Sequence, residues 1–100
     1  MAARLPNMPN KAPKLELVSE QRGDRVYEYY PLGEHIVAAR NFCGGRPTVK
    51  YRRLDARHII GRLKAGDSKK RISRDYEISL DVVDEAIELA SVYDYEKSYI

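Results

Sequence analysis

The sequence contains no tryptophan, one phenylalanine, one cysteine and two histidines among its 100 residues. A single cysteine, Cys43, excludes an intramolecular disulfide. His35, His58 and Cys43 show neither a Cys-x-x-Cys nor a His-x-x-x-His spacing, so no metal site is predicted. Cys43 has no recognisable catalytic base, and the two glycines that follow it do not form a phosphate-binding loop. We therefore expect no enzyme and no cofactor.

Long hydrophobic runs are also missing. No apolar segment approaches the ~20 residues that a membrane-spanning helix requires, and residues 1–17 lack the continuous apolar stretch of a secretory signal. We expect a cytoplasmic protein that does not enter a membrane. The content of 43% hydrophobic and 33% charged residues is typical of a folded chain, and 100 residues suffice for one small domain with a single core.

Charge is unevenly distributed along the chain. Residues 1–45 contain six Lys and Arg against five Asp and Glu, whereas residues 46–74 contain eleven against two. Residues 75–100 contain one against eight, so a net charge of +9 (11 − 2) is followed by one of −7 (1 − 8). This asymmetry indicates a chain that folds on itself electrostatically or one that meets two different partners, and the alternative is a solvated surface of mixed charge.

Composition also divides the chain into segments. Residues 1–14 contain three prolines between small and polar residues, so we expect a flexible arm there. One compact domain should follow over residues 15–100. We divide it into a β element at 15–54 and a trihelical part at 55–100.

The β element is predicted from aromatic and β-branched residues. Residues 25–30 and 34–40 predict a hairpin over Pro31–Gly33. Residues 15–20 can add an edge strand, and residues 48–51 look like one more short strand.

The remainder of the chain predicts three helices. Asp55 is suited to cap the first helix, Gly66 to end it, and Ser68 and Ser79 to cap the second and third. The core-facing residues are expected to be Ala56, Ile59, Ile60 and Leu63, then Ile72, then Leu80, Val83, Ile87 and Ala90, broadened by Val82, Ala86 and Leu89.

The last two helices fit the pattern of a helix-turn-helix. Ser73 supplies the small residue where the helices cross, Ile78–Ser79 the apolar residue and cap of the turn, and Val83 the apolar residue that fixes the last helix. Glu77 stands where a glycine in the left-handed conformation is usual. The predicted fold class is α+β and mostly α: an N-terminal β-hairpin element followed by a three-helix, homeodomain-like helix-turn-helix bundle.

The charged residues favour two interpretations of this unit. In a DNA-reading helix, residues near the N-terminus contact base edges, and here the corresponding helix carries Asp81, Asp84, Glu85 and Glu88. Carboxylates can accept a hydrogen bond from cytosine N4 in the major groove, but they repel the phosphates on either side. We therefore expect this face either to be neutralised by the neighbouring helix or to bind a basic partner. The residues expected on DNA phosphates are Arg46, Lys50, Arg52, Arg53, Lys69, Lys70, Arg71 and Arg74.

About residues 36–91 resemble the bacterial family catalogued as domain of unknown function 433. The resemblance rests on "HIVAARNFCGGRPTVKYRRLDARHIIGRLKAG" and "ISLDVVDEAIELA", with the Gly45-Arg46-Pro47 turn in place. Tyr51-Arg52-Arg53 replaces the family's Gly-Thr-Arg step. The resemblance implies a trihelical fold with an N-terminal β element, dimerisation through that element, and an antitoxin role beside a ribonuclease-like toxin of the PIN type.

Two functional hypotheses follow. The first is an antitoxin-like, dimeric DNA-binding regulator that pairs with such a toxin. The second is a protein-interaction module, toxin-neutralising or a structural dimer, that does not bind DNA. A homodimer formed by β pairing is expected in either case, because a lone hairpin is marginally stable in water. Tyr93, Tyr95 and Tyr99 are candidates to cover a dimer seam.

Overall fold

A four-stranded antiparallel sheet and three short helices make up the fold. The computed structural model describes residues 15–100, and the flexible arm predicted for residues 1–14 lies outside them. The strands are β1 (Val18–Arg22), β2 (Arg25–Pro31), β3 (Ile36–Ala39) and β4 (Pro47–Val49), which are neighbours in that order. A 3₁₀ turn, η2 (Cys43–Gly45), precedes β4, and the helices are α1 (Ala56–Lys64), α2 (Lys69–Tyr76) and α3 (Leu80–Leu89).

The prediction of a mostly α fold is therefore wrong. The expected hairpin is present as β2 and β3, but the strands anticipated on either side of it join the same sheet. β1 pairs with β2 along its whole length, and β4 pairs with β3 through Ile36 and Val49. Pairing turns four weak strand signals into one cooperative unit, because each added strand satisfies the backbone groups of its neighbour.

β3 lies at the centre of the core, and all four of its residues are buried. Because both faces of β3 are covered, neither face contacts water, and this explains its continuous apolar sequence "IVAA". Ile36 and Ala38 face the helices. Val37 and Ala39 belong to a second cluster on the opposite face, where they pack with tyrosines of β2.

Aromatic side chains cover that opposite face. The rings of Tyr27 and Tyr29 lie 5.1 Å apart, and Phe42 meets Tyr27 edge-on at 5.2 Å. Tyr51, in the loop after β4, adds a third contact to Tyr27 at 5.1 Å. Three of the eight tyrosines thus close a small second core, since the helices cover only one face of the sheet.

The caps predicted for α2 and α3 are confirmed. Ser68 Oγ accepts from the amide of Arg71, and Ser79 Oγ accepts from the amide of Val82. Between the helices Glu77 adopts φ 56° and ψ 50°, so the left-handed turn forms without glycine. Asp55 occupies the N-cap position of α1 as predicted, but its side chain makes no capping hydrogen bond and pairs with Arg46 instead.

The inward face of α3 is rotated from the one predicted. Val82, Val83 and Ala86 are buried, whereas Leu80 and Ile87 are 41% and 38% exposed. Ala90 is also exposed. After the helix, Tyr95 folds back and donates its hydroxyl proton to the carbonyl of Ala86. The buried stripe therefore lies against the sheet and the C-terminal segment as well as against the other helices.

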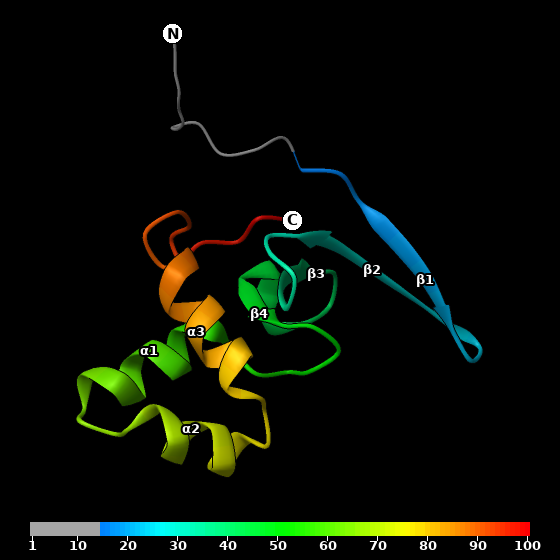
Figure 1. The fold of residues 1–100 in the computed structure, drawn as a ribbon. Helices are drawn as coiled ribbons and strands as arrows, with labels where there is room; N and C mark the ends of the chain where they lie inside the picture. Colours follow the sequence, from blue (N-terminus) through cyan, green and yellow to red (C-terminus); the bar gives the residue numbers. More distant parts are fainter. Residues whose placement is uncertain (1–14) are drawn as a thin grey trace, which may run out of the picture.

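The C-terminal segment packs on the same chain. Tyr93 and Tyr95 are buried in the core rather than left free for a dimer seam. The amide of Tyr99 donates to the carbonyl of Gly45 at 2.9 Å. Gly45 has φ +81°, and a Cβ there would overlap Ile100 and Ser98, so this docking requires glycine. Figure 1 shows the segment returning to the region of η2, while β1 and β2 reach away from the helices.

Two isoleucines provide a matched test of this core. Ile72 is fully buried and Ile87 is 38% exposed, although the sequence predicted both to be buried. Ile72→Ala should lower the free energy of unfolding by about 3 kcal/mol, and Ile87→Ala by less than about 1 kcal/mol, because the cost follows the apolar contact that is lost. Urea denaturation of both variants measures the difference. Equal losses would contradict the observed orientation of α3.

Candidate functional site

α2 gathers the basic residues that the sequence predicted for nucleic acid. Its four cations, Lys69, Lys70, Arg71 and Arg74, are all exposed. Arg71 and Arg74 lie 3.7 Å from the carboxylate of Asp75, which is too far for a strong pair. Asp75 is instead held by Arg62 of α1 at 2.8 Å, and this hydrogen bond lowers the pKa of Asp75. Most of the charge on α2 is therefore available to a ligand.

Two of the other predicted cations serve the fold. Arg46 pairs with the buried carboxylate of Asp55 at 2.9 Å. Arg52 donates to the carbonyls of Tyr76 and Glu77 at 2.7 and 3.3 Å, where α2 ends. These guanidinium groups neutralise a buried charge and satisfy helix-terminal carbonyls.

The remaining two predicted cations lie over aromatic rings. Lys50 Nζ is 4.9 Å from the ring centre of Tyr29, and a hydrogen bond with the Tyr29 hydroxyl raises the pKa of Lys50. Arg53 stacks on Phe42 at 4.5 Å and donates to the carbonyl of Asn41 at 3.1 Å. The eight predicted residues thus divide into four on α2 and four engaged elsewhere, and their role on DNA stays a prediction.

The acidic residues of α3 divide in the same way. Asp81, Asp84 and Glu88 are exposed, and Asp84 pairs with Lys69 at 2.9 Å. Glu85 is half-buried, and one of its carboxylate oxygens accepts from the amides of His35 and Ile36 at 2.7 and 2.8 Å. Glu85 therefore joins α3 to the start of β3, and it is not free to bind a partner as the sequence predicted.

Two apolar side chains share the outward face of α3 with the acids. At 3.6 residues per turn, the exposed residues of α3 and Ser91, the second residue after the helix, fall within about 120° of the helix circumference. We call this surface the α3 face; it consists of Leu80, Asp81, Asp84, Ile87, Glu88 and Ser91. Sequence reasoning missed it, because Leu80 and Ile87 have the helical spacing of core residues.

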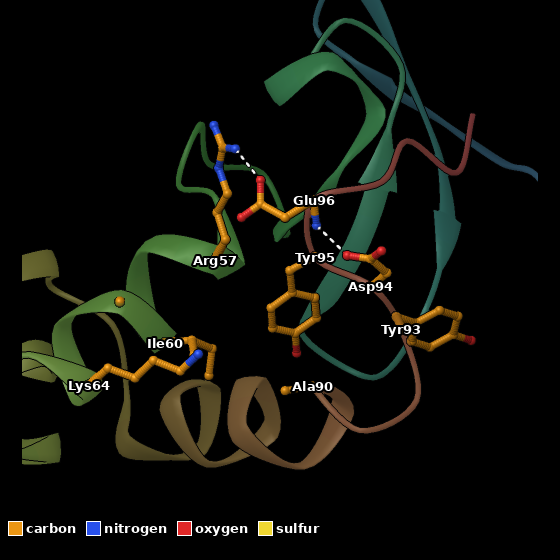
Figure 2. Close-up of a pocket in the computed structure, with 9 residues that line it drawn as sticks. Arg57, Ile60, Lys64, Ala90, Tyr93, Asp94, Tyr95 and Glu96 are labelled. Atoms are coloured by element: carbon orange, nitrogen blue, oxygen red, sulfur yellow. Dashed lines mark hydrogen bonds and ion pairs between the residues drawn. The ribbon is translucent and has the colours of Figure 1, made fainter.

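A cavity of about 520 Å³ lies between α1 and the C-terminal segment. Figure 2 shows Arg57 and Glu96 pointing toward one another, with Ile60 and Lys64 of α1 nearby. Arg57 Nη1 lies 2.7 Å from Glu96 Oε1. The lining combines cations, carboxylates and two tyrosines.

One group of described residues brings metal-ligating atoms together. Glu34, His35 and Glu85 each offer one ligand atom within 4.8 Å of the others. Because Glu85 already accepts two amide hydrogen bonds, its carboxylate has a structural task without an ion. A second cavity, of about 220 Å³, is lined by Arg22, Arg25, Arg40 and Arg53, and the sequence analysis singled out only the last of these four.

These features define a small α+β domain with charged helix faces. The model of the family described as "Protein of unknown function (DUF433)" matches residues 36–90, which include β3, β4 and all three helices. The chain belongs to this family, as its sequence suggested. No curated protein and no solved structure gave a significant match. Within the described residues, no helix has the length and hydropathy needed to cross a bilayer.

The position of Glu85 leads to a stability prediction. Glu85→Ala should lower the free energy of unfolding by about 2–3 kcal/mol, because two amides lose a charged acceptor. Exchange of the His35 and Ile36 amide protons, followed by NMR, should become faster. Glu88→Ala on the exposed side of α3 is the control and should change stability by less than about 0.5 kcal/mol. If the two variants were equally stable, Glu85 would not be the link between α3 and β3.

Proposed function

We propose that this protein is a non-enzymatic, antitoxin-like interaction module that uses α3 to bind a basic surface of another protein. In this proposal α2, the Glu77 turn and α3 form a helix-turn-helix unit whose usual DNA-reading helix is used for protein binding. The observation that carries the proposal is the composition of the α3 face, where Leu80 and Ile87 lie beside Asp81, Asp84 and Glu88.

This composition suits a protein partner better than a nucleic acid. Exposed apolar side chains next to charged ones are typical of interaction surfaces, where the apolar part excludes water and the charges fix orientation. DNA would meet carboxylates between its phosphate rows. A ribonuclease must bind RNA phosphates and therefore carries a basic surface. The toxin implied by the family resemblance is thus complementary in charge to the α3 face.

Lys69 shields the centre of this face. Its ammonium group lies 2.9 Å from Asp84 Oδ1, and both side chains are 55% exposed. A pair this exposed contributes at most about 1 kcal/mol. A cation of the partner can therefore replace Lys69 on Asp84 at small cost.

DNA binding remains a second candidate function because of one observation. Lys70, Arg71 and Arg74 are exposed on α2 and only loosely neutralised. In helix-turn-helix complexes the first helix of the motif crosses the phosphate backbone. In this second candidate function α2 binds the phosphate backbone in the same way, without base reading by α3.

Substitution of Lys69 is expected to change protein binding and DNA binding in opposite directions. Lys69→Met unmasks Asp84 and should tighten binding to a basic protein partner by about threefold, whereas it should weaken DNA binding, since it removes a cation from α2. Asp84→Asn should weaken the protein complex by about fivefold and leave DNA affinity equal or tighter. Titration against the product of the neighbouring gene and against the promoter fragment measures all four effects.

Lys97→Met is the matched control for net charge, because Lys97 is exposed in the C-terminal segment outside α2 and α3. It should change neither affinity by more than about twofold. Sequence-specific DNA binding that is abolished by Asp84→Asn would overturn the proposal, since α3 would then be reading bases.

The proposal includes a homodimer formed through β1. One edge of β1 pairs with β2, and no strand among the described residues pairs with the other edge. Leu17, which directly precedes β1, and Val26, in the paired strand β2, are 40% and 58% exposed. An open edge of this kind pairs readily with a second chain.

Light scattering at micromolar concentration should therefore give about twice the chain mass of 11.5 kDa. A monomer under these conditions would remove β pairing from the proposal and leave the α3 interaction to be tested alone.

A further inference from the structure

The cavity of about 220 Å³ at the hairpin is surrounded by arginines from three separate segments. Arg22 and Arg25 face each other across the β1–β2 turn. Arg40 follows β3, and Arg53 lies in the loop between β4 and α1. Because these segments are distant in the sequence, the tertiary structure alone brings the four arginines to one cavity.

The cavity exists because β2 is longer than its neighbour. β1 pairs with β2 as far as Arg25, but β3 pairs only with Tyr29–Pro31. The amide of Arg40 still donates to the carbonyl of Glu28, and the chain then turns away at Asn41, which has φ 70°. On the β3 side, the first residues of β2 therefore have no strand beside them, and the cavity lies there. Figure 1 shows β1 and β2 reaching away from the helices.

The positive charge of this cavity is poorly neutralised. Arg40 pairs with Glu28 at 2.9 Å. Arg22, Arg25 and Arg53 form no ion pair with any described residue, and residues 1–14 contain no Asp or Glu that could supply one. The nearby carboxylate of Glu20 accepts hydrogen bonds from Tyr51 and Tyr29 at 2.6 and 2.9 Å. Mutual repulsion of the guanidinium groups is a cost to the fold that a bound anion would offset.

Two of the arginines are also held in place before any ligand arrives. The guanidinium carbon of Arg22 lies 4.1 Å from the ring centre of Tyr51, and that of Arg53 lies 4.5 Å from the ring centre of Phe42. Stacking fixes the plane of a guanidinium group and leaves N–H donors at its edge free, which suits bidentate binding of a phosphate.

We propose that this arginine cavity binds a phosphate group of a nucleic-acid strand. The volume is below the roughly 300 Å³ at which pockets enclose a small organic ligand, so the cavity takes a phosphate and leaves the rest of the ligand outside. The site lies on the sheet and hairpin, apart from α2 and α3. It is therefore independent of the protein-docking function proposed for α3.

The test is fluorescence polarisation of the full chain with labelled oligonucleotides of arbitrary sequence, single- and double-stranded, of about 12 nucleotides. Arg22→Gln with Arg25→Gln should weaken binding at least tenfold and reduce the slope of log affinity against log salt by about 1–2. Both side chains are exposed at the hairpin turn, so urea denaturation should show unchanged folding. The matched control removes two cations from α2 by Lys70→Gln with Arg71→Gln, and it should weaken binding less than threefold.

Three results would overturn the proposal. The first is a loss of oligonucleotide affinity in the α2 control that equals or exceeds the loss in the Arg22/Arg25 variant. That result would assign binding to α2 or to net charge. The second is no binding of either oligonucleotide by the parent at about 50 mM salt. The third is displacement of the oligonucleotide by inorganic phosphate at millimolar concentration or below, which would make free phosphate the ligand. Weak competition by inorganic phosphate is the supporting outcome.

Discussion

The carboxylate of Glu85 determines how the two halves of the molecule meet. One of its oxygens accepts from two consecutive amides at the start of β3, and a Cβ at Gly33 would lie 2.6 Å from that same oxygen. A buried amide without an acceptor is costly, so α3 is held in one rotation about its axis. That rotation places Val83 inward and Asp84 outward. The composition of the exposed α3 face therefore follows from a single acceptor.

Some of the basic residues are likewise already engaged in contacts that stabilise the fold. Asp55 is 3% exposed, and a carboxylate so buried requires a cation, which Arg46 provides. Arg52 satisfies carbonyls at the end of α2. Such arginines cannot also neutralise a ligand without cost to the fold. Basic residues outside these pairs include the exposed cations of α2 and the arginines of the hairpin cavity.

Local patterns were read correctly where one residue acts on its own neighbours. Ser68 and Ser79 cap their helices because a hydroxyl reaches an amide three residues on, whatever the rest of the chain does. Glu77 takes the left-handed conformation at the end of α2 although it is not glycine. Asp55 occupies the predicted N-cap position, but its carboxylate does not cap the helix, because the competing partner, Arg46, lies nine residues earlier and reaches it only in the folded state.

The sequence by itself determined the family, the order of strands and helices, and the segregation of charge, because periodicity, turn residues and composition are local properties. The tertiary structure decided how many strands share one sheet, which isoleucine is buried and which carboxylate is free. Ile72 and Ile87 have the same helical spacing signal, but only packing distinguishes them. The arginine cavity has no local signal at all, since Arg22 and Arg53 become neighbours only when the loop after β4 folds under the sheet.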